Sequence, residues 1–302
     1  MPNYSYSDDP GSAIKNKLGA RTHDELDRLE GACVAALEAE LMDSRPIPGN
    51  FDAGHLKAIH QHLFQDVFEW AGHTRDEKVT LSDGSVATEP LLRKIDGELF
   101  MVAPMIPNAL DALADKLCAA ADLKGLARDE FAERAAGVMM DLNAVHPFRD
   151  GNGRTERVFM RFLAEQAGHG LDFSVVSRAR MIQASMAAND HDDNSLMRRM
   201  FAEISNPARV AALLPAIEFL EAQSFAWNDH YLSTAEPDQA VEVTFAGPAG
   251  QHFMARTGPG ILIGQAPIFQ RHGPSGARSL YSAHQIPHDV RIIFYIFYDV
   301  PG

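Results

Sequence analysis

The stretch VHPFRDGNGRTERVF, residues 145–159, gathers one histidine, one aspartate and three arginines around a Gly-Asn-Gly turn. Glycine reaches positive-φ conformations, so consecutive backbone N–H groups of Gly151, Asn152 and Gly153 can converge on one anion. A helix is expected to begin directly after the turn. Its first N–H groups and the positive end of its dipole favour the same ligand. The stretch therefore predicts a phosphate-binding turn.

The charged side chains around this turn complete a site for phosphate chemistry. Arg154 and Arg157 lie three residues apart on the expected helix, so they share a face and can bind phosphate oxygens together. Asp150 precedes the turn and can offer a carboxylate oxygen to Mg²⁺. His146 is the nearby side chain suited to take a proton from a hydroxyl. Together these groups predict in-line attack of a hydroxyl on a bound nucleotide phosphate. Taken singly, each has a commoner structural explanation as a loop or a solvated helix face.

The composition of the whole chain limits the classes of partner. The 302 residues carry a net charge of −14, which predicts no general affinity for nucleic acid and restricts any nucleotide site to a local positive pocket. Two cysteines exclude a disulfide framework and a cysteine-rich zinc site. No apolar run has the length of a signal peptide or a membrane span, so we expect no membrane span.

Hydrophobic periodicity predicts a mainly α fold with a small β-hairpin, followed by a small β domain. The hairpin is centred on Asp83-Gly84, a dipeptide that favours a type I′ turn. Residues 1–17 are polar and are expected to be frayed or loosely docked. The expected domains are residues 1–205, a linker helix over 206–235 and a β domain over 236–302. The helices expected in the first domain cover about 22–41, 51–72, 89–102, 108–123, 129–145, 155–168 and 177–204.

The residues HPFRDGNGR followed by TER, His146 to Arg157, match the signature of the Fic family at every defined position. The segment HLKAIHQHLFQDVFEWAGHTRD, residues 55–76, also resembles the corresponding Fic segment with its Trp-Ala-Gly and following arginine. We expect Trp70 itself to be a core residue. The resemblance covers residues 15–205 and implies a Fic-type helical bundle.

Fic proteins transfer AMP from ATP, with Mg²⁺, to a serine, threonine or tyrosine hydroxyl of a target protein. By resemblance, His146 is the general base, Asp150 binds Mg²⁺ and Arg154 grips the outer phosphates. Arg157 supports the same site, while Gly151, Asn152 and Gly153 form the phosphate nest, and residues 178–189 are expected to contact adenine. The hairpin corresponds to the family's flap, which registers the target segment by strand addition; the alternative is a hairpin without this role. The expected flap residues are Lys78, Val79, Thr80, Leu81, Ser82, Asp83 and Gly84.

Two further comparisons within the family narrow the expected chemistry. A relative that phosphorylates its target carries lysine where this chain has Gly153, so the glycine favours adenylyl transfer. Many Fic proteins carry an inhibitory helix reading Ser/Thr-x-x-x-Glu-Gly/Asn, and here only Glu30-Gly31 approaches it. Leu26 stands where the serine or threonine would be, so the pattern fails and Glu30 is interpreted as a solvated residue of the first helix. A separate small antitoxin that supplies the glutamate in trans is therefore expected.

Residues 14–42 resemble the opening of the Bartonella effector protein (Bep) and conjugation-toxin subset of Fic proteins. That subset places an OB-like β domain and then a basic secretion module after the Fic domain, so the chain is expected to be a piece of a longer effector or toxin. The implied location is the bacterial cytoplasm, with type IV secretion into a host or recipient cell, and a small GTPase is one implied target. From Val241 onward the chain has four arginines, no lysine and three acids, which favours a structural connector over a nucleic-acid groove.

Two other functions remain open at this point. The chain could be a Fic-fold binding or scaffold module with an idle site, or a Fic enzyme that transfers another phosphate-containing group.

Overall fold

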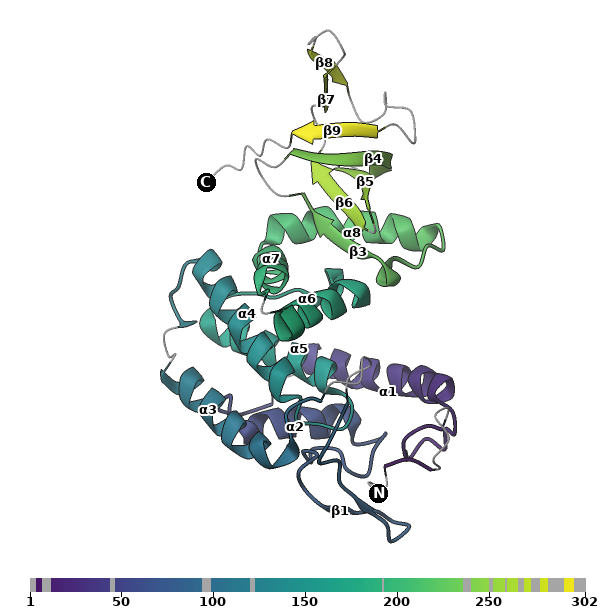
Figure 1. Ribbon diagram of the computed structural model, residues 1–302, viewed down its shortest axis with the longest axis vertical. Helices are drawn as coiled ribbons and strands as arrows, with labels where there is room; N and C mark the ends of the chain where they lie inside the picture. The colour runs from purple at the N-terminus through teal and green to yellow at the C-terminus, as the bar shows by residue number, and fades with distance from the viewer. Residues whose placement is uncertain are drawn as a thin grey trace. The chain divides into compact units, whose positions relative to one another are not determined.

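The computed structural model describes residues 4–6, 12–43, 47–93, 99–119, 123–191, 193–235, 240–249, 252–258, 260–265, 269–272, 278–281 and 291–295. The chain divides into two compact units, residues 1–127 with 134–169, and residues 128–133 with 170–302. Helices dominate and the sheets are small, so the expected fold class is confirmed (Figure 1). No helix among the described residues combines the length and the apolar character that crossing a bilayer requires.

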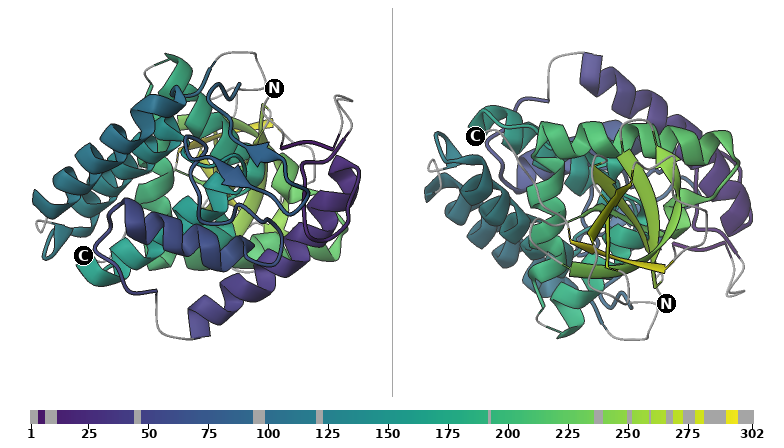
Figure 2. Two further views of the ribbon diagram at one scale, coloured as in Figure 1. Left: turned by 90° about the horizontal axis from the view of Figure 1, so that it is seen from below. Right: turned by 90° about the horizontal axis from the view of Figure 1, so that it is seen from above.

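The first unit is a helical bundle in which α2 packs against α1, α3 and α5 (Figures 1 and 2). Asp52 caps α2 by accepting a hydrogen bond from the N–H of His55 at 2.8 Å. The helix expected over 51–72 ends at Phe64, after which the chain turns and buries Phe68 and Trp70 completely. The expected core role of Trp70 is confirmed. The helices of this bundle are α1 (His23–Asp43), α2 (Ala53–Phe64), α3 (Ile106–Ala119), α4 (Arg128–Val145, of which Arg128–Glu133 group with the second unit) and α5 (Asn152–Ala167).

The N-terminal segment is docked in its described residues, 4–6 and 12–17, so of the two expected states fraying was wrong there. Tyr4 is buried and packs edge to face on Trp70, with ring centroids 5.3 Å apart. Ala13 and Ile14 are also buried, and the N–H of Lys17 bonds to the Val67 carbonyl at 2.7 Å. Two large rings and two aliphatic side chains thus anchor a segment whose composition is otherwise polar.

The expected hairpin is present as β1 (Val79–Thr80) and β2 (Val86–Ala87), paired antiparallel. The expected type I′ turn was wrong, because that turn needs two positive φ angles and only Gly84 has one, at 80°. The N–H of Gly84 bonds to the Leu81 carbonyl at 2.9 Å, and the N–H of Leu81 bonds to the Ser85 carbonyl at 2.8 Å. These bonds close a longer loop than a two-residue turn.

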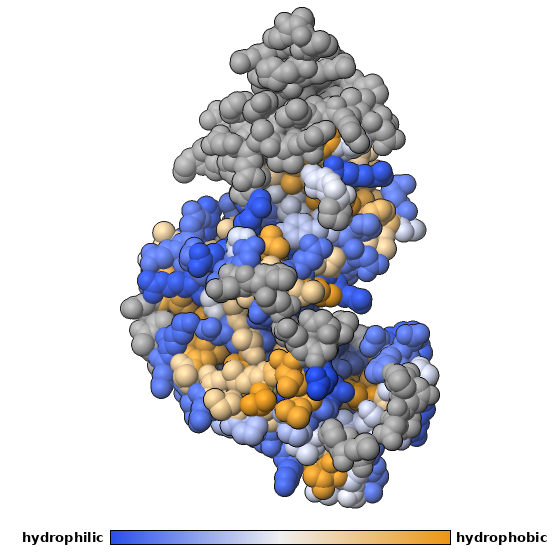
Figure 3. Space-filling view, in the orientation of Figure 1, coloured by the Kyte–Doolittle hydropathy of each residue, from blue (hydrophilic) through white to orange (hydrophobic). Residues whose placement is uncertain are grey.

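The helix expected over 89–102 was wrong at 89–93 and 99–102, and residues 94–98 lie outside the described part. Arg93 and Leu99 form an antiparallel bridge there, and the first helical turn is a 3₁₀ helix at Ala103–Met105. Apolar residues of this region stay exposed, and Figure 3 shows apolar surface around α2 and α3. The large exposed apolar residues of this part are Val86, Leu91, Leu99, Val102 and Met105.

The second unit joins helices to a five-stranded sheet in the order β3-β6-β5-β4-β9. Strand β3 is parallel to β6, and the other neighbours are antiparallel. Helix α8 packs against β3, β4, β5 and β6 (Figure 2). Strands β7 and β8 form a separate hairpin. The bounds are α6 (Arg178–His191), α7 (Ser195–Ile204), α8 (Pro207–Ala222), β3 (Tyr231–Thr234), β4 (Ala240–Ala249), β5 (His252–Thr257), β6 (Gly260–Gln265), β7 (Phe269–His272), β8 (Arg278–Tyr281) and β9 (Arg291–Tyr295).

Two local features hold this second unit together. Buried Arg180 of α6 pairs with Glu203 of α7, which also accepts the N–H of Thr234 in β3 at 2.7 Å. In the sheet, Phe253 lies opposite Gly264, where an added Cβ would stand 2.2 Å from the Phe253 ring. The expected OB-like identity of this β region remains a prediction.

Candidate active site

The signature residues lie where α4 ends and α5 begins. His146 follows the last residue of α4 and has a left-handed backbone, with φ 46° and ψ 64°. Its N–H bonds to the Leu142 carbonyl at 2.9 Å and closes the helix. A residue with a Cβ is uncommon in this conformation, which carries a strain of about 1 kcal/mol or more. Neighbouring contacts must therefore hold the backbone of His146 in place.

The surroundings of the His146 imidazole favour its neutral form. Its ring stacks on Phe100 with centroids 3.8 Å apart. Burial, followed by the positive charges of Arg75 and Arg149, lowers the pKa of His146 to about 3. No described residue hydrogen-bonds to either ring nitrogen. A neutral imidazole keeps one unprotonated ring nitrogen, whose lone pair can accept a proton.

The loop between the two helices is closed by the side chain of Asn152. Its Oδ1 accepts the N–H of Phe148 at 2.9 Å, and its Nδ2 donates to the Phe148 carbonyl at 2.9 Å. Asn152 is 4% exposed and Phe148 is 1% exposed. The side chain of Asn152 thus fixes the shape of the loop. The main-chain N–H groups at the start of α5 are then available to a ligand.

His60 of α2 contacts two residues of the same loop, Phe148 and Asp150. Its ring stacks on Phe148 with centroids 3.9 Å apart, and its Nδ1 accepts the N–H of Gly72 at 2.8 Å. Because Nδ1 is the acceptor, Nε2 carries the hydrogen and donates to the Asp150 carbonyl at 3.1 Å. Burial lowers the pKa of His60 to about 3, so the ring stays neutral.

Gly151 opens α5 with φ 80°, a conformation that suits glycine. A Cβ at this position would stand 2.4 Å from the Phe64 ring, so a side chain is also excluded by space. No side chain caps the N-terminus of α5 among the described residues. The first N–H groups of the helix, those of Asn152, Gly153 and Arg154, have no intrahelical acceptor. This end is therefore suited to bind an anion.

Asp150 lies at the edge of this helix end and is partly exposed. Its Oδ1 accepts the N–H of Gly151 at 2.6 Å, while Oδ2 bonds to no described residue. The described residues hold no group of three or more His, Cys, Asp or Glu side chains arranged for a metal ion. A cation here would rely on Asp150 together with oxygens of the ligand.

Arg154 lies on the first turn of α5 and pairs with Glu30 of α1. Its guanidinium carbon stands 5.0 Å from the centroid of the Phe64 ring. The expectation that Glu30 is solvated was wrong, since the residue is 2% exposed. Glu30 lies four residues from both Leu26 and Val34, so it shares their buried face of α1. Burial, opposed by Arg154, raises the pKa of Glu30 to about 7.

Arg157 lies one turn further along α5 and makes no ion pair or hydrogen bond with the described residues. It is partly buried. A Cβ at Gly153 would stand 3.6 Å from the Arg157 Nη1, an ordinary contact distance. Space alone therefore does not require glycine at position 153, in contrast to position 151.

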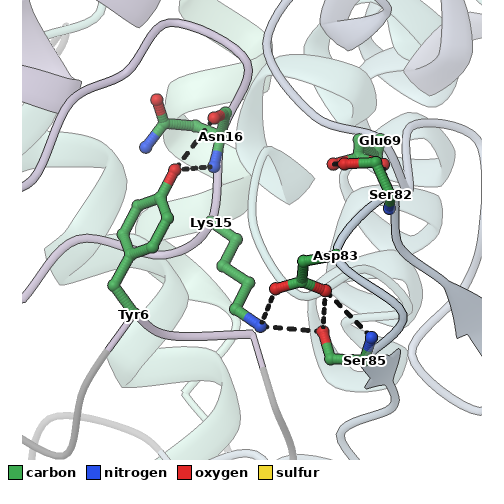
Figure 4. A network of polar contacts seen from close by, with 7 residues as sticks. All are labelled: Tyr6, Lys15, Asn16, Glu69, Ser82, Asp83 and Ser85. Carbon is green, nitrogen blue, oxygen red and sulfur yellow. Dashed lines mark hydrogen bonds and ion pairs between the residues drawn. The ribbon is translucent and has the colours of Figure 1, made fainter.

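The tip of the flap is fastened on two sides, as Figure 4 shows. The Nζ of Lys15 bonds to the Asp83 carboxylate at 2.8 Å and to the Ser85 hydroxyl at 2.7 Å. On the other side, Glu69 accepts the N–H and the hydroxyl of Ser82 at 2.7 and 2.8 Å. These bonds fix the turn from the N-terminal segment and from the segment that follows α2.

The expected flap residues divide by exposure. Leu81 is 4% exposed and anchors the hairpin in the core. The others are exposed or partly exposed, namely Lys78, Val79, Thr80, Ser82, Asp83 and Gly84. After the hairpin, Glu89 pairs with Arg149 of the signature loop at 2.9 Å, which ties the flap to the site.

The structure thus brings His146, Asp150, the helix start at Gly151 and Arg154 together, with the flap attached through Arg149. The expected adenine region, residues 178–189, forms most of α6 in the second unit. Sequence reasoning missed Glu30, His60 and Arg75. For Glu30, the sequence offered one indication, because it lies at i, i+4 spacing within an apolar stripe. For His60 and Arg75, the only indication was their place in the segment that resembles the Fic family.

Residues 50–164 match the sequence model of the Fic/DOC family. A protein adenylyltransferase of Bartonella henselae is 32% identical over 84% of this chain and 46% of its own length. The protein adenylyltransferase VbhT of Bartonella schoenbuchensis is 35% identical over 69% of this chain and 41% of its own length. The chain thus spans less than half of these two relatives. A probable protein adenylyltransferase of Sinorhizobium fredii is 31% identical over 61% of this chain and 87% of its own length.

Two solved structures resemble the chain closely. The type IV secretion system effector protein BepA has a TM-score of 0.87 and 28% identity, with 99% of this chain and 97% of that chain covered. The BepC protein of Bartonella tribocorum, solved with bound AMPPNP, has a TM-score of 0.65 and 39% identity over 68% of this chain and 97% of that chain. The complete signature on the loop before α5, the matched family region and these similarities agree: the chain belongs to the Fic/DOC family.

Proposed function

We propose that this chain is a protein adenylyltransferase, which transfers AMP from ATP to a serine, threonine or tyrosine hydroxyl of a target protein. The observation that carries the proposal is the position of His146, directly after α4 and in the loop that leads to the uncapped N-terminus of α5. The names of the relatives, protein adenylyltransferases, and the AMPPNP bound to BepC support it.

In the proposed reaction, the target hydroxyl gives its proton to His146 and its oxygen forms a bond to the α-phosphorus of ATP. The bond from the α-phosphorus to the oxygen that bridges to the β-phosphate breaks, and pyrophosphate leaves. The N–H groups of Gly151, Asn152 and Gly153 and the guanidinium of Arg154 would hold the outer phosphates, with Arg157 in support. When Arg154 binds these phosphates, its guanidinium must either keep its ion pair with Glu30 at the same time or give that ion pair up.

Mg²⁺ fits the residues present. Asp150 offers a partly exposed carboxylate whose Oδ2 bonds to no described residue. Mg²⁺ commonly binds one or two carboxylates and completes its shell with phosphate oxygens and water. When bound, the ion would neutralise phosphate charge.

The flap is proposed to present the target hydroxyl by pairing with an extended segment of the target. Its exposed strand β1, Val79–Thr80, supplies main-chain groups, and the clamped turn at Ser82 and Asp83 fixes its place. A small GTPase is the first target class to test. Residues 178–189 are proposed to contact the adenine.

The relatives also suggest where and with what the chain acts. BepA and BepC are named as secretion effectors, which supports translocation of this chain into a host cell from the bacterial cytoplasm. A small antitoxin is proposed as a partner that supplies a glutamate to the site, and unpaired Arg157 is the group that it would meet. Residues 236–302 are proposed to form an OB-like connector without nucleic-acid binding.

The test is incubation with ATP, Mg²⁺ and a host-cell lysate. Label in the α-phosphate should appear on a protein band, and His146→Ala should remove it. Label in the γ-phosphate should not appear, because that phosphate leaves with pyrophosphate. A γ-labelled band would indicate a kinase instead. No band in any lysate, together with failure to bind ATP, would indicate a binding module with an idle site.

A further inference from the structure

Arg75 is a buried cation outside the signature that bonds only to main-chain carbonyls. It has no exposed surface. Its Nε donates to the His146 carbonyl at 2.9 Å, and its Nη2 donates to the carbonyls of Val145, at 3.4 Å, and Met101. Its Nη1 donates to the Glu89 carbonyl at 3.4 Å. No described carboxylate forms an ion pair with it. A buried charge without a direct ion pair is costly to keep, although the carboxylates of Glu89 and Asp76 favour it from a distance. The carbonyl partners of Arg75 therefore identify what it holds.

Two of these carbonyls, those of Val145 and His146, belong to the end of α4 and to the strained residue that follows it. The main-chain N–H of Arg75 adds a bond to the Pro147 carbonyl at 2.8 Å. Arg75 therefore engages three consecutive carbonyls, those of residues 145 to 147. A guanidinium also complements the partial negative charge at a helix C-terminus. The left-handed backbone of His146 is held by this set of bonds.

Two further bonds of Arg75 reach Glu89, in the segment that follows the hairpin. The Glu89 carbonyl accepts Nη1, and the N–H of Glu89 donates to the Arg75 carbonyl at 3.0 Å. Glu89 follows β2, so Arg75 fixes the spacing between His146 and the hairpin. If the flap presents the hydroxyl, this spacing sets the distance from the hydroxyl to the imidazole.

We infer that Arg75 is the positioning residue of the transfer reaction, which locks the backbone of His146 and its spacing from the flap. The inference rests on the proposed adenylyl transfer. The positive charge of Arg75 has a second effect, because after burial it is the next cause that lowers the pKa of His146. Arg149 is the other charged group that acts on this imidazole.

The experiment compares Arg75→Gln, which removes the charge, with Arg75→Lys, which keeps the charge but not the planar fork. Both should lower kcat by about 100-fold while the Kd for AMPPNP changes less than about threefold, because α5 is untouched. NMR titration of the His146 ring, assigned with His146→Asn, should show its pKa rising by about half a unit in Arg75→Gln and staying in Arg75→Lys.

Leu56→Ala is the matched control, since Leu56 is 1% exposed in α2 and lies outside the site. It should lower thermal stability without moving the His146 pKa or kcat at a temperature where it is folded. The inference is overturned if folded Arg75→Lys or Arg75→Gln keeps wild-type kcat, or loses AMPPNP affinity in proportion to kcat. Should Arg75→Gln not fold, Arg75→Lys decides alone. Absence of transfer by the wild type would instead contradict the proposed function, and the titration would still test the contact.

Discussion

At the scale of single residues, the strength of the phosphate site depends on whether Glu30 is ionised. Burial raises the pKa of Glu30 to about 7, close to the pH of the cell. Asp150 and Asp27 also raise it, and Arg154 lowers it. Above that pH the Glu30 carboxylate is ionised and forms the ion pair with Arg154. Below that pH Glu30 is protonated, and the guanidinium of Arg154 is released from the ion pair.

We therefore expect the KM for ATP to rise from pH 6 to pH 8. Glu30→Gln should remove this dependence and lower the KM at pH 8 by about fivefold, because no charge competes for Arg154. Steady-state rates at both pH values measure this. Arg154→Ala is the control and should raise the KM with little dependence on pH in this range. An unchanged slope in Glu30→Gln would show that another group titrates.

Glu156 is a second buried carboxyl, and it bears on stability. Both of its oxygens are buried without a hydrogen-bond partner, and burial raises its pKa to about 8. Folding favours the protonated form, so this contribution to stability is full below about pH 4.5 and is lost as the pH rises through 8. Glu156→Gln should gain on the order of 3 kcal/mol relative to the wild type between pH 5 and pH 8. Urea unfolding at the two pH values tests this, and parallel losses in both proteins would contradict it.

The signature residues could be predicted from the sequence because their chemistry and spacing are local. His146, Asp150 and the glycine turn lie within eight residues, 146–153. The residues that hold them act across the fold: Glu30 is 124 residues from Arg154, His60 is 90 from Asp150, and Arg75 is 71 from His146. Tertiary packing alone brings such pairs together, and no local pattern encodes them.

At the scale of elements, the flap is a weak hairpin that its neighbours stabilise. Two residue pairs join its strands, which is too few for independent stability. Lys15 and Glu69 supply the missing support at the turn. The flap should therefore respond to changes in the N-terminal segment.

Lys15→Ala should speed hydrogen exchange of the amides in residues 79–87 by about fivefold and raise the KM for the target protein more than that for ATP. The ammonium also holds the pKa of Asp83 below its ordinary value, so lowering the pH far enough to protonate Asp83 should have a similar effect. Lys17→Ala is the matched control, because Lys17 bonds to the Gln65 carbonyl and not to the flap. Equal exchange in both variants would contradict the clamp.

Long periodic helices could be predicted from the sequence, and the segments between them could not. Apolar stripes found α1, α4 and α5 with bounds close to those observed. The segment after the hairpin has the composition of a helix but not its structure. The N–H of Glu89 donates to the Arg75 carbonyl, and the N–H of Phe100 donates to the Leu92 carbonyl. Because these N–H groups bond to more distant residues, they do not form the hydrogen bonds of a helix.

At the scale of the whole molecule, the net charge of −14 opposes any polyanion. Binding to nucleic acid depends on released counterions, and an acidic protein releases few. We expect a fluorescent single-stranded oligonucleotide in 0.15 M salt to bind more weakly than about 0.1 mM. Anisotropy with DNA and RNA measures this. Micromolar binding that weakens with added salt would show that the β region forms a nucleic-acid groove after all.

The pairing of Phe253 with Gly264 limits how sequences of this kind can diverge. The ring occupies the space that a side chain at position 264 would need, and removing the ring would leave a bare glycine in the middle of a strand. Neither residue can change alone without a clash or a hole. Descendants of a common ancestor should therefore exchange both together, as a smaller residue at 253 with a larger one at 264, or keep the two unaltered.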